Sequence, residues 1–158
     1  EKLIILIAYL IISFLFFNIT FLYSNDFFRN FNLLILIIIS FDTFSYIFGS
    51  YFGKFKILKN ISPNKTFEGV IGGIISTYIF SYIYLLYFGF NIDFTKFIYV
   101  NLLIISCFIG DIIESYFKRI NNLKNSSNIL PGHGGFFDRF DSFIFSIISF
   151  TILNYLTL

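Results

Sequence analysis

The residues best suited to chemistry fall in one polar segment, residues 115–141. Glycines there would let backbone amides approach a ligand, and amides together with cations suit phosphate groups. Asp138 and Asp141 are three residues apart, so on a helix they would share one face. Carboxylates beside a phosphate site favour Mg²⁺, which commonly uses one or two protein carboxylates together with substrate phosphates. The segment has four cations, three glycines and the only histidine of the chain: Lys118, Arg119, Lys124, Arg139, Gly132, Gly134, Gly135 and His133.

A second basic segment, residues 53–69, offers another place for a phosphate. The Ser-Pro-Asn run at residues 62–64 is typical of a turn, and Thr66 is placed to cap a helix that follows it. Lys65 and Thr66 beside a helix amino end would supply a cation, a hydroxyl and free amides, which together favour a phosphate. An ordinary basic loop beside a membrane explains the other cations equally well: Lys54, Lys56 and Lys59.

Carboxylates also interrupt two apolar stretches. Asp42 lies about ten residues from the end of its stretch, roughly 15 Å deep at 1.5 Å per residue. A charge at that depth is costly unless it is paired, hydrated or bound to a metal. Asp42 and Asp111 each begin a polar helix face that leads toward the basic segments. The first face continues with Ser45, Tyr46 and Gly49, and the second with Glu114, Ser115 and Lys118. The two faces predict a polar cavity; a structural interhelical hydrogen bond is the alternative, and a stronger one for Asp42 than for Asp111.

The elements that must position these side chains are membrane-spanning helices. Of 158 residues, 57% are hydrophobic and 13% are charged, whereas soluble domains average roughly 25% charged residues. A spanning helix needs about 20 mostly apolar residues, and five stretches are candidates, near residues 3–23, 32–52, 69–88, 97–117 and the shorter 142–156. Gly69, Gly72 and Gly73 favour close helix contact. The predicted fold is an all-α polytopic transmembrane bundle of about five spanning helices, forming one membrane-embedded domain over residues 1–158.

The basic residues lie unevenly with respect to these stretches. Nine of the eleven fall on one side, which the positive-inside rule makes cytoplasmic. The net charge of +2 is too small to favour a nucleic-acid partner. Cys107 is the only cysteine and lies in an apolar run, which excludes an internal disulfide or a cysteine-based metal site and favours a small buried residue.

Together these residues indicate a class of reaction. Many cations favour an anionic ligand with more than one phosphate, the carboxylates favour a metal, and the membrane setting favours a lipid as the other reactant. No serine–histidine–aspartate order or placed cysteine nucleophile is evident, which points to direct phosphoryl or nucleotidyl transfer. The residues alone name neither the nucleotide nor the lipid.

The two basic segments resemble the diagnostic motifs of phosphatidate cytidylyltransferases. The long motif matches Ser115-x-Phe117-Lys118-Arg119-x4-Lys124, then Ser127, Leu130-Pro131-x-His133-Gly134-Gly135-Phe136-x-Asp138-Arg139-Phe140-Asp141. The run from Ile61-Ser62-Pro63 through Lys65-Thr66 to Gly69 and Gly72-Gly73 looks like a second family stretch, and Asp42-Thr43 and Gly110-Asp111-x-x-Glu114-Ser115 fit two more. The family usually has Asp at the position of Asn125 and Arg at that of Ser50.

This resemblance implies that CTP and phosphatidic acid give CDP-diacylglycerol and pyrophosphate. Asp111 and Asp138 would hold Mg²⁺, with a second cation such as K⁺. Lys65, Lys118, Arg119, Lys124 and Arg139 would neutralise the phosphates, and the remaining candidate substrate or supporting groups are Asp42, Ser62, Thr66, His133, Gly134, Gly135 and Asp141. It further implies a carboxyl-terminal part of a longer enzyme, in a bacterial inner membrane, and a possible homodimer. The alternatives are a related enzyme of the CDP-archaeol type, a transporter or channel subunit, and an inactive relative.

Overall fold

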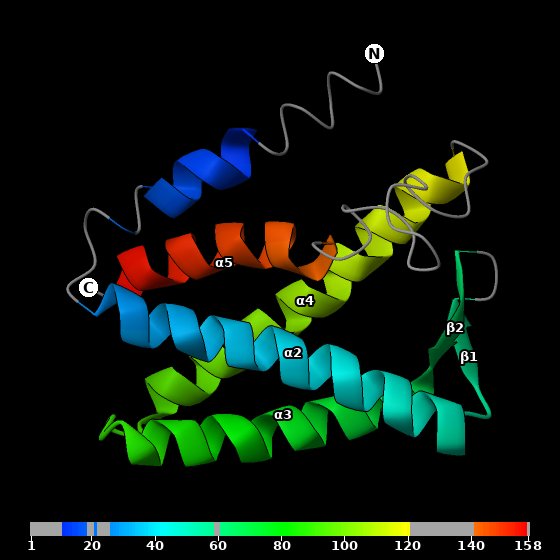
Figure 1. The fold of residues 1–158 in the computed structure, drawn as a ribbon, viewed down its shortest axis with the longest axis horizontal. Helices are drawn as coiled ribbons and strands as arrows, with labels where there is room; N and C mark the ends of the chain where they lie inside the picture. The colour runs from blue at the N-terminus through cyan, green and yellow to red at the C-terminus, as the bar shows by residue number, and fades with distance from the viewer. Residues whose placement is uncertain (1–10, 19–20, 22–25, 59–60, 121–140, 158) are drawn as a thin grey trace, which may run out of the picture.

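The structure, a computed structural model, describes residues 11–18, 21, 26–58, 61–120 and 141–157. Residues 11–18 are helical. The labelled elements, in chain order, are α2 (Phe27–Phe52), β1 (Lys56–Leu58), β2 (Ser62–Thr66), α3 (Phe67–Tyr87), α4 (Phe94–Ile120) and α5 (Asp141–Thr157). Figure 1 shows α2 and α3 side by side, α4 crossing behind them, α5 along α2, and the β1–β2 hairpin at one end of the helices.

The predicted helical bundle is confirmed. Helices α2, α3 and α4 are long and apolar enough to cross a membrane, and the apolar stretch of α5, Ser142–Leu156, is shorter. Helix α2 begins at Phe27, earlier than predicted, and has 26 residues. The outer faces of the helices carry many exposed apolar side chains, such as Ile39, Ile75 and Leu102. Residues of this kind are suited to lipid contact.

The interior of the bundle is apolar at its centre. Leu33, Leu34 and Ile37 of α2 and Leu103 of α4 are completely buried, and Phe150 of α5 packs into the same cluster. These side chains fix the positions of α4 and α5 relative to α2.

Glycines bring α2 and α3 into close contact, as predicted. A Cβ atom on Gly69 would lie 2.6 Å from the Ser45 carbonyl oxygen and 3.0 Å from the Gly49 Cα. A Cβ atom on Gly73 would lie 2.0 Å from the Ser45 hydroxyl. At Gly69 a larger residue would meet the backbone of α2 and would not fit without a shift of the helices, whereas at Gly73 it would first displace the Ser45 side chain. Gly69 therefore sets the spacing of the pair.

The predicted turn at residues 62–64 is wrong. These residues belong to β2, which pairs antiparallel with β1 and places Lys56 opposite Thr66. Pro63 is tolerated because a two-stranded ribbon consists only of edge strands, where a missing N–H need not break a ladder. The segment between α2 and α3 is therefore an ordered hairpin, the one sheet among the described residues of an otherwise helical structure.

Candidate functional site

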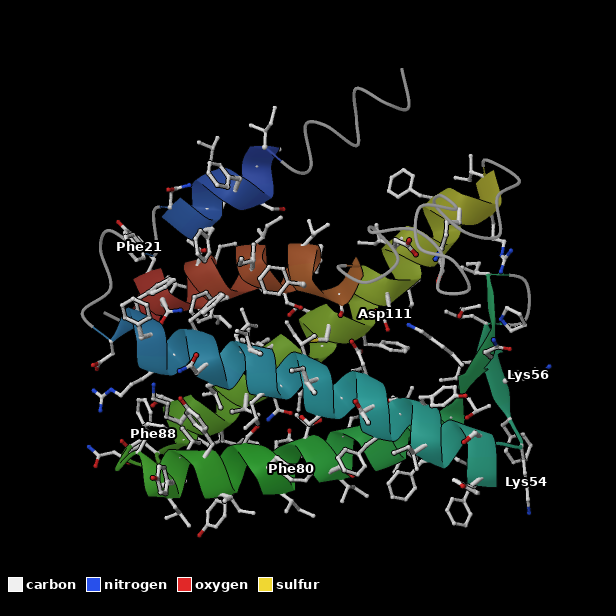
Figure 2. The ribbon with its side chains drawn as sticks, in the orientation of Figure 1. Phe21, Lys54, Lys56, Phe80, Phe88 and Asp111 are labelled. Atoms are coloured by element: carbon white, nitrogen blue, oxygen red, sulfur yellow. The ribbon has the colours of Figure 1, made fainter. Side chains whose placement is uncertain are left out.

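An ion pair joins the hairpin to the interior of the bundle. Lys65 Nζ on β2 lies 2.7 Å from Asp111 Oδ2 on α4, and the two side chains are only 21% and 16% exposed. The same ammonium lies 5.3 Å from the centre of the Phe108 ring, a cation–π arrangement. Two residues that the sequence assigned to different parts of one site are thus in direct contact. Figure 2 shows Asp111 among the helices, whereas Lys54 and Lys56 extend away from them.

The start of α3 holds Lys65 in place. The side chain of buried Thr66 caps α3 by accepting a hydrogen bond from the Gly69 amide at 3.2 Å, as its sequence position predicted. The Glu68 carboxylate accepts hydrogen bonds from the Lys54 amide at 3.1 Å and the Phe55 amide at 3.2 Å. These bonds fasten the base of the hairpin to α3, so β2 directs Lys65 toward α4.

Two further cations of the site also have partners. Arg119 Nε donates to the Ile61 carbonyl oxygen at 3.1 Å, which ties the end of α4 to the residue before β2. Lys118 Nζ lies 2.5 Å from Glu114 Oε2, one helical turn earlier, and both side chains are about four-fifths buried at 19% and 18% exposure. The polar face predicted from Asp111 to Lys118 is therefore present and points toward the hairpin.

The face predicted from Asp42 is divided between two neighbours. Ser142 Oγ on α5 donates to Asp42 Oδ2 at 3.0 Å, so Asp42 faces α5. Ser45 and Gly49 instead face α3. Tyr46 is 77% exposed, so its predicted place on the inward face is wrong. On a helix, Ser45 and Tyr46 lie on opposite sides of the direction of Asp42, and only the Ser45 side meets α3.

Asp42 and Asp111 border the same part of the interior. Cys107, one turn before Asp111 on α4, is fully buried and accepts a hydrogen bond from Ser146 Oγ at 3.2 Å, and Ser146 lies one turn after Ser142, the partner of Asp42. Cys107 is thus a small buried residue, as predicted. Ser142 and Ser146 lie one turn apart on α5, and the sequence offered no motif that singled them out. A serine at helical spacing in an apolar stretch is the weak signal that could have found them.

Several predicted site residues lie outside the described residues. They are Lys124, His133, Gly134, Gly135, Asp138 and Arg139, and Asp141 is described only as the first residue of α5. Ser62 is described at the start of β2, three residues before Lys65.

The donor chemistry of Asp111 suits a divalent cation. Its carboxylate already accepts one cation, the Lys65 ammonium, in a position that water reaches only partly. Within the described ranges no three acidic, histidine or cysteine side chains gather closely enough to hold a metal by themselves. Mg²⁺ commonly takes only one or two protein carboxylates and completes its shell with water and phosphate oxygens. Asp111 therefore fits as one ligand of such an ion.

Comparisons with known proteins identify the family of the chain. The model of the cytidylyltransferase family matches residues 1–157. The chain belongs to this family. Its similarity to phosphatidate cytidylyltransferases from bacteria extends over 114 residues, with 47% identity for Staphylococcus haemolyticus, 46% for Staphylococcus aureus and 42% for Staphylococcus epidermidis. Each match covers 71% of this chain and 44% of the relative, so the chain corresponds to less than half the length of these relatives. Family membership and the apolar helices together make the chain an integral membrane protein.

Proposed function

We propose that the chain transfers a cytidylyl group from CTP to phosphatidic acid, giving CDP-diacylglycerol and pyrophosphate. The observation that supports this most directly is the Lys65–Asp111 pair, because it joins the predicted phosphate-binding segment to the predicted metal ligand. The relatives are named phosphatidate cytidylyltransferases. Their name supplies the nucleotide and the lipid, which the geometry does not specify.

In the proposed reaction the protein positions two phosphates and neutralises their charge. An oxygen of the lipid phosphate forms a bond to the α-phosphorus of CTP while the bond to the bridging oxygen breaks and pyrophosphate leaves. Asp111 and Asp138 would hold Mg²⁺, with a second cation such as K⁺ close by. Mg²⁺ bound there would supply charge neutralisation for the triphosphate and the leaving group. The cations proposed to bind the phosphates are Lys65, Lys118, Arg119, Lys124 and Arg139.

The other predicted groups would support these contacts. Gly134 and Gly135 would offer backbone amides to a phosphate, with Ser62 and Thr66 at the hairpin and His133 and Asp141 in the second segment beside them. Asp42, which Ser142 contacts on α5, would support the site from the side of α5.

The hairpin end of the bundle would face the cytoplasm, where CTP is made. Five described cations lie at or near this end: Lys54, Lys56, Lys65, Lys118 and Arg119. At the opposite end Arg29 and Lys96 flank the ring of Phe90, each 5.0 Å from its centre. This asymmetry satisfies the positive-inside rule.

The test is cytidylyl transfer by the purified chain in detergent, with radiolabelled CTP, phosphatidic acid, and Mg²⁺ in the presence or absence of chelator. We expect metal-dependent CDP-diacylglycerol, and a loss of about a hundredfold or more in the Asp111→Asn variant without loss of the folded protein. Substantial activity in that variant would contradict the proposed role of Asp111. Product from an archaeal ether-linked phosphatidic acid in place of the ester lipid would assign the CDP-archaeol reaction instead.

A further inference from the structure

The charged groups of the site are bound to one another. Lys65 pairs with Asp111, and Lys118 pairs with Glu114. The lysines are the groups expected to bind phosphate, and Asp111 is the group expected to bind a metal. The Lys65–Asp111 pair therefore joins a group expected to bind an anion to a group expected to bind a cation, and the two charges neutralise each other.

Water cannot readily replace a partner in these pairs. The four side chains are between 16% and 21% exposed, and the Lys65 ammonium is additionally covered by Phe108. Removing one member of a poorly hydrated ion pair leaves the other charge uncompensated, which costs far more than breaking an exposed pair. A cation that binds Asp111 competes with the Lys65 ammonium for the charge of the carboxylate, and an anion that binds Lys65 competes with Asp111 for the charge of the ammonium.

We propose that the Lys65–Asp111 pair is an exchange device that couples metal binding to triphosphate binding. A divalent cation takes the place of the ammonium at Asp111, and the released ammonium binds a phosphate of the nucleotide. This inference deepens the proposed function and rests on it for the identity of the nucleotide, although the exchange itself concerns only the pair and its two ligands.

The exchange makes each ligand alone bind weakly and the two together bind well. A cation alone strands Lys65, and a triphosphate alone strands Asp111, whereas both ligands compensate both charges. Because coupling between two ligands is reciprocal, each must raise the affinity of the other by the same factor. The pair would thus keep the empty site neutral inside the membrane protein.

The first experiment measures metal binding without nucleotide. Mn²⁺ is titrated into the purified chain in detergent, and free Mn²⁺ is followed by its electron paramagnetic resonance signal. Lys65→Gln removes the competing ammonium, so we expect Mn²⁺ to bind about tenfold more tightly, the effect of ~1.4 kcal/mol. Lys56→Gln is the matched control, because Lys56 is an exposed cation of the paired strand that enters none of the ion pairs of the described residues.

The second experiment measures the reciprocal effect. Binding of CTP is followed by calorimetry with chelator present, so that no divalent cation is available. Asp111→Asn releases the ammonium, and we expect metal-free CTP to bind several-fold more tightly. Asp93→Asn removes an exposed carboxylate just before α4, at the opposite end of that helix from the hairpin, and should leave this affinity nearly unchanged. Gel filtration and thermal unfolding establish that each variant is folded.

The outcomes separate the exchange from the proposed reaction. If Lys65→Gln weakens Mn²⁺ binding or leaves it equal to the Lys56→Gln control, the exchange is wrong even where cytidylyl transfer is observed. If Lys65→Gln tightens Mn²⁺ and Asp111→Asn tightens metal-free CTP, the exchange holds even where no CDP-diacylglycerol forms. If the Lys65→Gln variant does not fold, the Asp111→Asn variant decides. An affinity of Asp111→Asn for metal-free CTP equal to that of the unaltered chain also overturns the exchange.

Discussion

Ser142 connects the first turn of α5 to the Asp42 carboxylate of α2 through a 3.0 Å hydrogen bond. Its side chain is almost completely buried, so the hydroxyl and the carboxylate hold each other in a fixed direction. A hydrogen bond to a charged group contributes about 1.5–3 kcal/mol. Because it orients Asp42, we expect Ser142 to act as a positioning residue for the proposed reaction.

Replacing Ser142 by Ala should lower kcat about tenfold and leave the KM for CTP nearly unchanged, because the hydroxyl orients a group without touching the nucleotide. The decisive measurement is a double-mutant cycle with Asp42→Ala. If Ser142 acts through Asp42, the serine substitution has no further effect on kcat once Asp42 is absent. Ser106→Ala is the control, since buried Ser106 bonds, among the described residues, only to the Leu103 carbonyl of its own helix. Additive effects of the two substitutions would contradict the positioning role.

At the residue scale, types could be predicted but partners could not. The charges of Lys65 and Asp111 and the capping role of Thr66 follow from local sequence. The pairing of Lys65 with Asp111 does not, because the two residues are 46 positions apart and meet only after β2 and α4 are packed. Tyr46 was misplaced because helical periodicity alone does not tell which flank of Asp42 meets a neighbouring helix.

At the scale of elements, glycine contacts on α3 determine how closely it approaches α2. Gly69→Ala would bring a Cβ atom within 2.6 Å of a backbone oxygen, which cannot move without moving α2. We expect a loss of ~1–3 kcal/mol in unfolding free energy, as for other overpacked sites. Thermal unfolding in detergent, followed by circular dichroism, measures it. Gly89→Ala would be a poor control because its φ of +67° already favours glycine, so lipid-facing Ile75→Ala serves instead. Equal stability of the Gly69 and Ile75 variants would contradict the close contact.

The helices could be predicted from sequence, whereas the hairpin could not. Spans of about 20 apolar residues are set by the thickness of the bilayer, so hydropathy alone locates them. The strands depend on contacts with residues outside them. The Phe67 amide donates a hydrogen bond to the Phe55 carbonyl oxygen at 2.8 Å, and the Glu68 carboxylate accepts one from the Phe55 amide. Neither strand has a long alternating pattern, and Pro63 argues against a strand when it is read locally.

At the scale of the whole molecule, the end opposite the hairpin is held by a buried polar network. Asn30 Nδ2 of α2 donates to Asn154 Oδ1 of α5 at 3.0 Å, and Asn154 Nδ2 donates to the Tyr99 hydroxyl of α4 at 3.1 Å. All three side chains are at most 9% exposed. Figure 1 shows the start of α2 and the end of α5 together at this end, with the hairpin at the other. The network therefore joins three helices far from the proposed site.

This separation predicts that the network supports stability without tuning the site. Asn154→Ala leaves partners on α2 and α4 without their hydrogen bonds, and we expect a loss of about 1 kcal/mol in unfolding free energy, the usual scale for such bonds between membrane helices. The Mn²⁺ affinity of the same variant should stay within about twofold of the unaltered chain, since changes at distant sites add independently. Asn18→Ala is the control, because the one bond of the Asn18 side chain within the described part of the chain goes to the Phe14 carbonyl one turn earlier. A large drop in Mn²⁺ affinity for Asn154→Ala, but not for the control, would contradict this prediction. It would show that the packing of α4 and α5 at the end opposite the hairpin sets the position of Asp111.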